Sequence, residues 1–132
     1  IPVFADMLHN RYGCRCTVLR REGELGAARF PGLEVIRKAD LVVVFFRRCA
    51  LPESQLAMMR EYLTEGKPLV GVRTTNHAFA ARDNIAPGHA AWGAFCDEVL
   101  GCGNYGYGPE ALGTDVRVEA QAADHPIHIG AE

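Results

Sequence analysis

The sequence predicts a single α/β domain built on a mostly parallel sheet. Residues 41–46 (LVVVFF) are apolar throughout and rich in β-branched side chains, which is typical of a strand buried on both faces of a parallel sheet. A helical pattern follows and leads to a second apolar run, residues 69–72. Strands that alternate with helices favour parallel pairing through right-handed crossovers. The length of 132 residues suits one domain.

The N-terminal third predicts two helices and a strand. Residues 3–12 carry apolar side chains at helical spacing, and Gly13 follows as a helix stop. Residues 16–20 (CTVLR) favour a short strand, and residues 21–32 form a loop rich in glycine and charge. Residues 33–38 favour a short helix.

The helix after the first apolar run is the best-specified element. Pro52 suits the first position of a helix, where no backbone N–H is needed. Leu56, Met59 and Leu63 form an apolar stripe at spacings of three and four residues, and Gly66 ends the helix. The elements predicted further along are a helix over residues 92–100, a glycine-rich loop over 101–113 and an edge strand over 115–120 (DVRVEA).

Composition and charge exclude several classes of protein. Lys plus Arg number 14 and Asp plus Glu 16, so the net charge of −2 gives no electrostatic reason to expect nucleic acid or a membrane surface as a partner. A hydrophobic content of 48% is too high for disorder. The longest apolar run is far below the roughly 20 residues that span a bilayer, and the first residues lack the features of a signal peptide. The five scattered cysteines predict reduced thiols and a cytoplasmic location.

Polar residues follow both apolar runs, at the edge of a parallel sheet where ligands bind. Arg47, Arg48 and Cys49 come after the first run, and residues 73–77 (RTTNH) come directly after the second. If the two strands are neighbours, these segments lie side by side on one rim. We therefore select Arg73 and His77 as candidate catalytic residues, which should share one pocket. The candidate substrate-binding residues are Arg48, Thr74, Asn76, Tyr105 and His125.

Each candidate also has a structural interpretation. Arg73 either contacts a ligand or pairs with a carboxylate, and His77 either moves a proton near neutral pH or packs under the next segment. Cys49 is either an activated thiol or, as we favour, an inert one. The remaining candidates are also typical turn or capping residues (Thr74, Asn76, His125), solvated charges (Arg47, Arg48) or packed aromatic rings (Tyr105, Trp92). No histidine pair has metal-binding spacing, so we expect no metal or other cofactor.

Several motifs together resemble ThuA-like proteins, which are named for trehalose utilisation. They are LPESQLAMMREYLTEGKPLVGVRTTNHAFAAR at residues 51–82, followed by AWGAFCDEVLG, GNY and ADHPI. The resemblance covers nearly the whole chain, and GKPLVGVRTTNHAF is its most specific part. It implies a flavodoxin-like three-layer α/β/α sandwich of the class I glutamine amidotransferase-like superfamily, and a role in the metabolism of trehalose or a related disaccharide.

The chain departs from this family pattern at three points. It lacks the first strand, which would lie between residues 16–20 and 41–46, and it ends before the C-terminal part of the family domain. Residues 1–132 are therefore expected to form a single, incomplete ThuA-like domain in which residues 16–20 and 41–46 do not pair directly. Open sheet edges favour association, so we expect a homodimer. Gly108 stands where family members often carry a histidine.

The resemblance also bears on the mechanism. Superfamily members that hydrolyse glutamine place a cysteine on the tight turn after a strand, as G-x-C-x-G, and Arg73 holds that position here within residues 71–75 (GVRTT). A guanidinium stays protonated and has no free lone pair, so Arg73 cannot attack a carbonyl. This excludes glutamine hydrolysis by the covalent cysteine route. The remaining cation, hydroxyls, amide and imidazole suit hydrogen bonding to a polyol or an oxyanion.

Three functions remain open at this point. The first is an enzyme that acts on a sugar or an oxidised disaccharide, with Arg73 polarising an oxygen and His77 moving a proton. The second is a catalytically inactive amidotransferase-like domain that binds a sugar or a partner protein. The third is a hydrolase that uses Cys49, which the missing cysteine at the turn disfavours.

Overall fold

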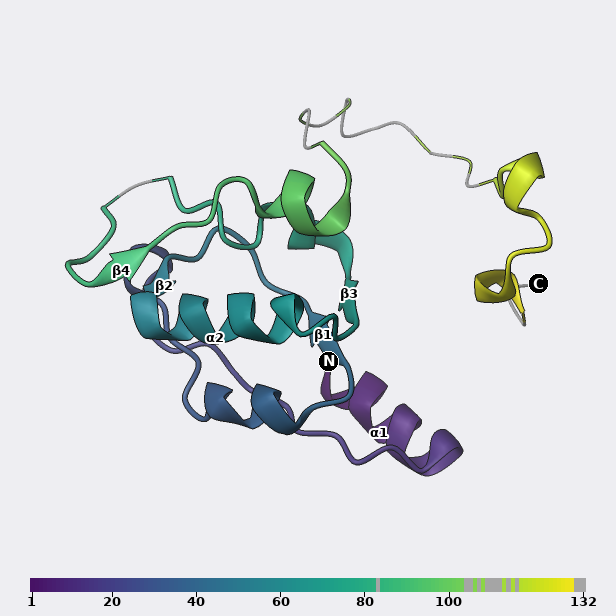
Figure 1. The fold of residues 1–132 in the computed structure, drawn as a ribbon, viewed down its shortest axis with the longest axis horizontal. Helices are drawn as coiled ribbons and strands as arrows, with labels where there is room; N and C mark the ends of the chain where they lie inside the picture. The colour runs from purple at the N-terminus through teal and green to yellow at the C-terminus, as the bar shows by residue number, and fades with distance from the viewer. Residues whose placement is uncertain are drawn as a thin grey trace.

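The computed structural model describes residues 1–82, 84–103 and 117–129, together with residues 106, 108, 113 and 115. This part of the chain is mixed α/β, as predicted (Figure 1). Its α-helices are α1 (Pro2–Tyr12) and α2 (Glu53–Thr64), and its strands are β1 (Val42–Val44), β2 (Leu51–Pro52), β3 (Leu69–Gly71) and β4 (His89–Ala90). None of its helices is both long enough and apolar enough to cross a membrane.

The two apolar runs form neighbouring parallel strands, which confirms the central prediction. β1 pairs with β3 in a register that places Val43 opposite Val70. The helix that connects them, α2, follows Pro52 and ends just before Gly66, whose φ of 74° lies in the left-handed region that glycine adopts without strain. A second, antiparallel pair of strands, β2 and β4, was not predicted.

The hydrophobic core lies along α2. Leu56, Met59 and Tyr62 of α2 are buried, and Val44 of β1 belongs to the same buried cluster. The short 3-10 helix η2 (Leu33–Lys38) lies beside α2 (Figure 1). The core continues beyond β1 and β3 in a cluster of aromatic rings in contact, namely Phe46, Phe79, Trp92 and Phe95.

The prediction that both apolar runs are buried on both faces is wrong. Leu41, Phe45 and Val70 are 46%, 44% and 47% exposed, whereas Val44 is 3% exposed. Successive side chains of a strand point to opposite faces, so the exposed residues share the face that is turned away from the core. A two-stranded sheet in the described part of the chain lacks the helices that cover both faces of larger parallel sheets.

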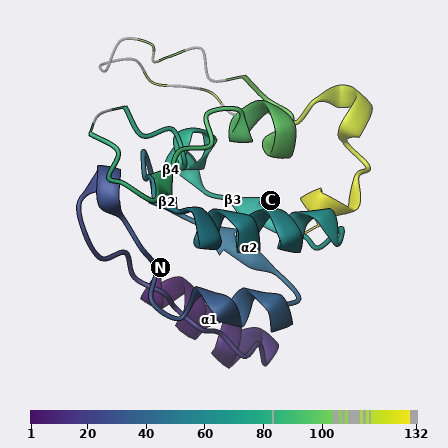
Figure 2. The same cartoon turned by 60° about the vertical axis from the view of Figure 1, so that its left-hand side comes forward.

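In the N-terminal region both predicted helices form, the second of them as the 3-10 helix η2 over residues 33–38, but the predicted strand does not. α1 ends at Gly13, which has a left-handed φ of 68°, but none of the residues of α1 is buried. Both views place α1 at the outer edge of the molecule (Figures 1 and 2). The predicted strand over residues 16–20 does not form. No described strand lies beside residues 16–20 to complete a ladder. These residues also do not pair with β1, and the predicted gap between two strands stays a prediction because the first strand is absent.

Two predictions nearer the C-terminus are also corrected. The helix predicted over residues 92–100 is reduced to one turn of π-helix, η4 (Cys96–Leu100), because the chain before it runs through a turn at Gly93. The edge strand predicted over residues 115–120 is absent from the described residues of that stretch, which pair with no other strand. A short 3-10 helix, η5 (Ala120–Ala122), begins there instead.

Candidate functional site

The two polar segments that follow β1 and β3 lie side by side, as predicted. The backbone N–H of Arg48 donates to the carbonyl of His77 at 2.8 Å, and the N–H of Cys49 donates to the carbonyl of Ala78 at 2.7 Å. The second segment folds as the 3-10 helix η3 (Arg73–His77), directly after β3. A polar rim therefore exists at the carboxyl ends of the two parallel strands.

Thr75 anchors this rim to the sheet. It is 1% exposed, and its hydroxyl donates to the carbonyl of Val44 at 2.6 Å and accepts from the N–H of Val72 at 3.0 Å. Gly71 permits this close packing, since a Cβ at Gly71 would lie only 3.0 Å from the Thr75 methyl group. The sequence identified Thr75 only as a turn residue, and it gave no signal for this bridge between β1, β3 and η3.

Two arginines on the rim have a left-handed backbone. The φ angle is 53° at Arg48 and 52° at Arg73, a conformation that costs a residue with a Cβ on the order of 1–3 kcal/mol. Residues held in this way are often found at functional sites, because the surrounding structure must impose the conformation. Arg73 thus stands on a tight turn directly after a strand, which is the backbone geometry expected at that position.

His77 is almost completely buried, at 5% exposure, and its pKa is lowered. Burial is the main cause, and the positive charges of Arg48, Arg47 and Arg82 lower the pKa further. The imidazole is therefore neutral near pH 7 and is suited to accept a proton rather than to act as a cation. Arg82 was not among the predicted site residues, although it follows His77 by only five residues.

Two buried polar atoms on the rim have no hydrogen-bond partner among the described residues. They are the Nε donor of Arg48 and the Oδ1 acceptor of Asn76. Their stretches of chain are adjacent, since the Arg48 backbone bonds to His77, the residue that follows Asn76. Buried polar groups are nearly always hydrogen-bonded, so each of these two atoms needs a partner such as water or a ligand.

The two candidate catalytic residues differ in their exposure to solvent. Arg73 is exposed at the start of η3, whereas His77 is buried at its end. Thr74, between them, is half-buried. A cavity of about 310 Å³ lies between α1 and residues 15–18, and neither Arg73 nor His77 lines it. Their expected location in one shared pocket stays a prediction.

Cys49 matches the description of an inert thiol. It is fully buried, its Sγ lies 3.4 Å from the carbonyl of Arg47, and burial raises its pKa. The charge and hydrogen bond of Arg21 oppose this effect only in part. A thiol with a raised pKa is a poor nucleophile at neutral pH, so the structure gives no support to a hydrolase that uses Cys49.

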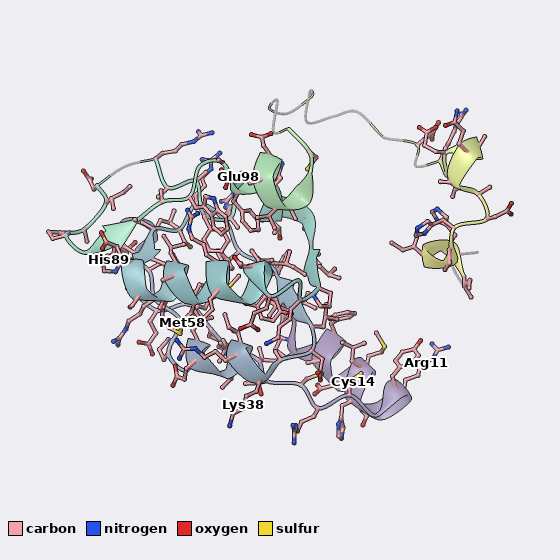
Figure 3. The ribbon with its side chains drawn as sticks, in the orientation of Figure 1. Arg11, Cys14, Lys38, Met58, His89 and Glu98 are labelled. Carbon is pink, nitrogen blue, oxygen red and sulfur yellow. The ribbon has the colours of Figure 1, made fainter. Side chains whose placement is uncertain are left out.

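The remaining candidates are not brought to the rim. His125 is exposed on a C-terminal segment that stands apart from the rest of the molecule (Figure 1), and its Nδ1 accepts from the N–H of Ile127 at 3.2 Å, which is a capping role. Trp92 is part of the core, with its Nε1 donating to Glu98 at 2.7 Å (Figure 3 labels Glu98). Tyr105 lies outside the described residues.

The described residues contain no group of three or more His, Cys, Asp or Glu side chains placed to hold a metal ion. Comparison of the chain with models of known protein families, with curated proteins and with solved structures finds no match in any of the three. The function therefore has to be argued from the motifs and from the rim itself.

Proposed function

We propose that the chain is a ThuA-like domain that binds or processes trehalose or a related disaccharide on the rim formed by residues 47–49 and 73–77. The motifs around GKPLVGVRTTNHAF support the family, and the parallel pairing of β1 with β3 supports the placement of the rim. The proposal includes a flavodoxin-like three-layer sandwich as the complete fold, a cytoplasmic location and the absence of glutamine amidotransferase activity.

The observation that carries this proposal is the pair of unpartnered atoms on the rim. Arg48 Nε can only donate a hydrogen bond and Asn76 Oδ1 can only accept one. A hydroxyl group both accepts and donates, so sugar hydroxyls suit the donor as well as the acceptor. Satisfying buried polar groups in this way gives specificity, since a ligand without hydroxyls leaves one of them unpaired.

The two candidate catalytic residues of the rim, Arg73 and His77, have complementary roles in this proposal. Arg73 is exposed at the start of η3, where its fixed positive charge can polarise an oxygen of the bound sugar. His77 is neutral at pH 7, so it can accept a proton from a hydroxyl.

A thermal-shift screen with trehalose, other disaccharides and their keto forms tests binding. A ligand at about a hundred times its Kd stabilises the folded chain by roughly 2.7 kcal/mol. We expect the shift to be lost in Asn76→Ala and Arg73→Ala and kept in Asn10→Ala, a matched change at an exposed residue of α1. A shift that is equal in all three variants, or no shift from a protein that melts cooperatively, refutes the sugar site.

Turnover separates an enzyme from a binding domain. An enzyme of this design loses turnover of the sugar in His77→Ala while it keeps measurable binding. If binding occurs without turnover in the unchanged chain, the catalytically inactive alternative holds instead.

That alternative, a domain that binds a partner protein, is favoured by the free edge of β1. In a parallel strand, alternate residues direct their N–H and C=O groups to opposite edges. Val42 donates to Pro68 and Val44 accepts from Val72, both on the β3 side. The N–H and C=O of Val43 therefore point to the other edge, where no described strand pairs with β1.

We propose a second copy of the chain as the partner at this edge. An antiparallel pairing about a two-fold axis at Val43 would place Leu41 of one copy opposite Phe45 of the other. Both side chains are nearly half exposed on the uncovered face, so the pairing would bury them. The edge also lacks the proline and lysine residues that usually protect exposed strands.

A further inference from the structure

Two thiols lie in contact at the end of the short π-helix η4. Cys96 begins η4 and is 4% exposed, whereas Cys102 follows the helix and is exposed. Their Sγ atoms are 3.4 Å apart, and the Cys96 Sγ also donates to the Cys102 carbonyl at 2.7 Å. The two cysteines are thus separated by five residues in sequence but touch through their side chains.

The backbone, rather than chance proximity of side chains, brings these thiols together. Gly101 ends η4 in the left-handed conformation, with φ 65° and ψ 24°, and its N–H bonds back to the carbonyl of Cys96. The N–H of Cys102 bonds to the same carbonyl at 3.3 Å. This glycine-dependent return turn typically places the residue after the glycine over the last helical turn.

We propose that Cys96 and Cys102 are a redox-active dithiol that forms a reversible intrachain disulfide by exchange with a small or protein-borne disulfide. The Sγ atoms must approach from 3.4 Å to about 2.05 Å. A rotation of the exposed Cys102 side chain can supply much of this movement, since the backbone turn already holds the two residues together. This inference does not depend on the proposed sugar site.

The chemistry is a two-step exchange. The Cys102 thiolate attacks one sulfur of the oxidising disulfide, forms a mixed disulfide and releases one thiolate. Cys96 then gives its proton to solvent and attacks the Cys102 sulfur, which expels the second thiolate. The two cysteines lose two electrons and two protons in all, and the oxidising disulfide is reduced to two thiols.

The order of the two steps follows from the surroundings of each sulfur. Burial raises the pKa of Cys96 to about 11, and the neighbouring Cys102 and Asp97 add to the effect. Very little Cys96 thiolate exists at neutral pH, and the oxidant cannot reach a side chain that is 4% exposed. Cys102 is therefore the point of entry, and Cys96 is the residue that completes the disulfide.

The location of the pair gives the disulfide a structural effect. η4 lies beside η3 and also packs against the end of β3, since the Leu100 side chain lies 3.5 Å from the position of a Cβ at Gly71. A disulfide would fix the end of η4 and limit fraying of the element that supports η3. In the chain-entropy model, closing a loop of about seven residues predicts a rise in melting temperature of about 9 °C for a chain of this length.

The test is incubation of the chain with oxidised glutathione, followed by thiol counting and peptide mapping. We expect peptide mapping to show a link between Cys96 and Cys102 that dithiothreitol reverses. Because Cys14 and Cys16 are also exposed and can take up glutathione, the thiols are counted in the variant Cys14→Ser with Cys16→Ser, where two of the remaining three should be lost. In Cys96→Ser, Cys102 should remain as a stable mixed disulfide with glutathione. In Cys102→Ser, Cys96 should not react.

The double variant Cys14→Ser with Cys16→Ser is the matched control. These two thiols are exposed near α1, on the opposite side of the molecule from η4 (Figure 3 labels Cys14 and Glu98). The control should form the same disulfide at an unchanged rate, and its far-ultraviolet circular dichroism reports whether it folds. Retention of all three remaining thiols in this control, or the absence of a Cys96–Cys102 link in it, overturns the proposal.

Discussion

Replacing Thr75 with valine tests how the rim is held to the sheet. The change keeps the shape of the side chain but removes the hydroxyl, which donates to Val44 at 2.6 Å and accepts from Val72 at 3.0 Å. Thr75 is 1% exposed, so water cannot replace either bond. We expect a lower free energy of unfolding and a looser η3.

The magnitude follows from what remains after the hydroxyl is removed. The N–H of Val72 and the carbonyl of Val44 are also bonded to each other at 3.0 Å, so neither is left without a partner. The cost is therefore the net value of the lost hydrogen bonds, about 1–2 kcal/mol, without the larger penalty of an unsatisfied buried group. For a chain of this length, that corresponds to a fall in Tm of about 4–8 °C.

Urea denaturation followed by circular dichroism measures this loss, with Thr64→Val as the matched control. Thr64 also donates its hydroxyl to a carbonyl, that of Arg60 at 2.8 Å, but it is exposed and water can take its place. The control should change the free energy of unfolding by less than about 0.5 kcal/mol. Equal losses in the two variants would refute the assignment of Thr75 as the anchor of the rim.

Three further predictions follow from the same structure. Because the pKa of His77 is lowered from 6.5, the unfolded chain takes up this proton at a higher pH than the folded chain, so the free energy of unfolding should fall as the pH drops below 6.5. Denaturation at several pH values should show that the free energy of unfolding of His77→Gln depends less steeply on pH. An unchanged dependence on pH contradicts the lowered pKa. Gly71→Ala places a Cβ 3.0 Å from the Thr75 methyl and should lower the free energy of unfolding by about 1–2 kcal/mol. The control, measured by calorimetry, is Gly93→Ala, because a Cβ at Gly93 would have no atom within 4 Å. Equal melting temperatures of the two variants argue against the contact with Thr75. Phe45→Lys puts a charge on the uncovered face and should abolish a dimer in sedimentation velocity, whereas a dimer that survives the change must use another surface.

Local sequence patterns were sufficient to predict an element where the segment that it packs against is close in sequence or strongly apolar. The parallel pairing of residues 41–46 with residues 69–72, the helix between them and its glycine stop all follow from apolar periodicity and end signals. The strand expected over residues 16–20 failed for the opposite reason. Its five residues have strand propensity, but a strand exists only through a neighbour, and no described strand lies beside it.

The site was predicted only as far as topology determines it. The rule that ligands bind at the carboxyl ends of parallel strands placed Arg48 and residues 73–77 on one rim, and backbone hydrogen bonds connect them. The burial of His77, which is 5% exposed, could not be predicted, because it depends on how distant parts of the chain pack around it. The contact between the thiols at η4 was also missed, since it depends on the backbone conformation of one glycine.

The choice between a sugar and an oxyanion at the rim rests on Asn76. Arg47, Arg48 and Arg82 act together on His77, and such a group of cations would by itself attract an anion. A fully deprotonated oxyanion only accepts hydrogen bonds, so it would satisfy Arg48 Nε but could not donate to the buried Oδ1 of Asn76. A hydroxyl satisfies both atoms without bringing like partial charges together. In the proposed sugar site, the arginines would help to keep His77 neutral, the state in which it could take a proton from a bound hydroxyl.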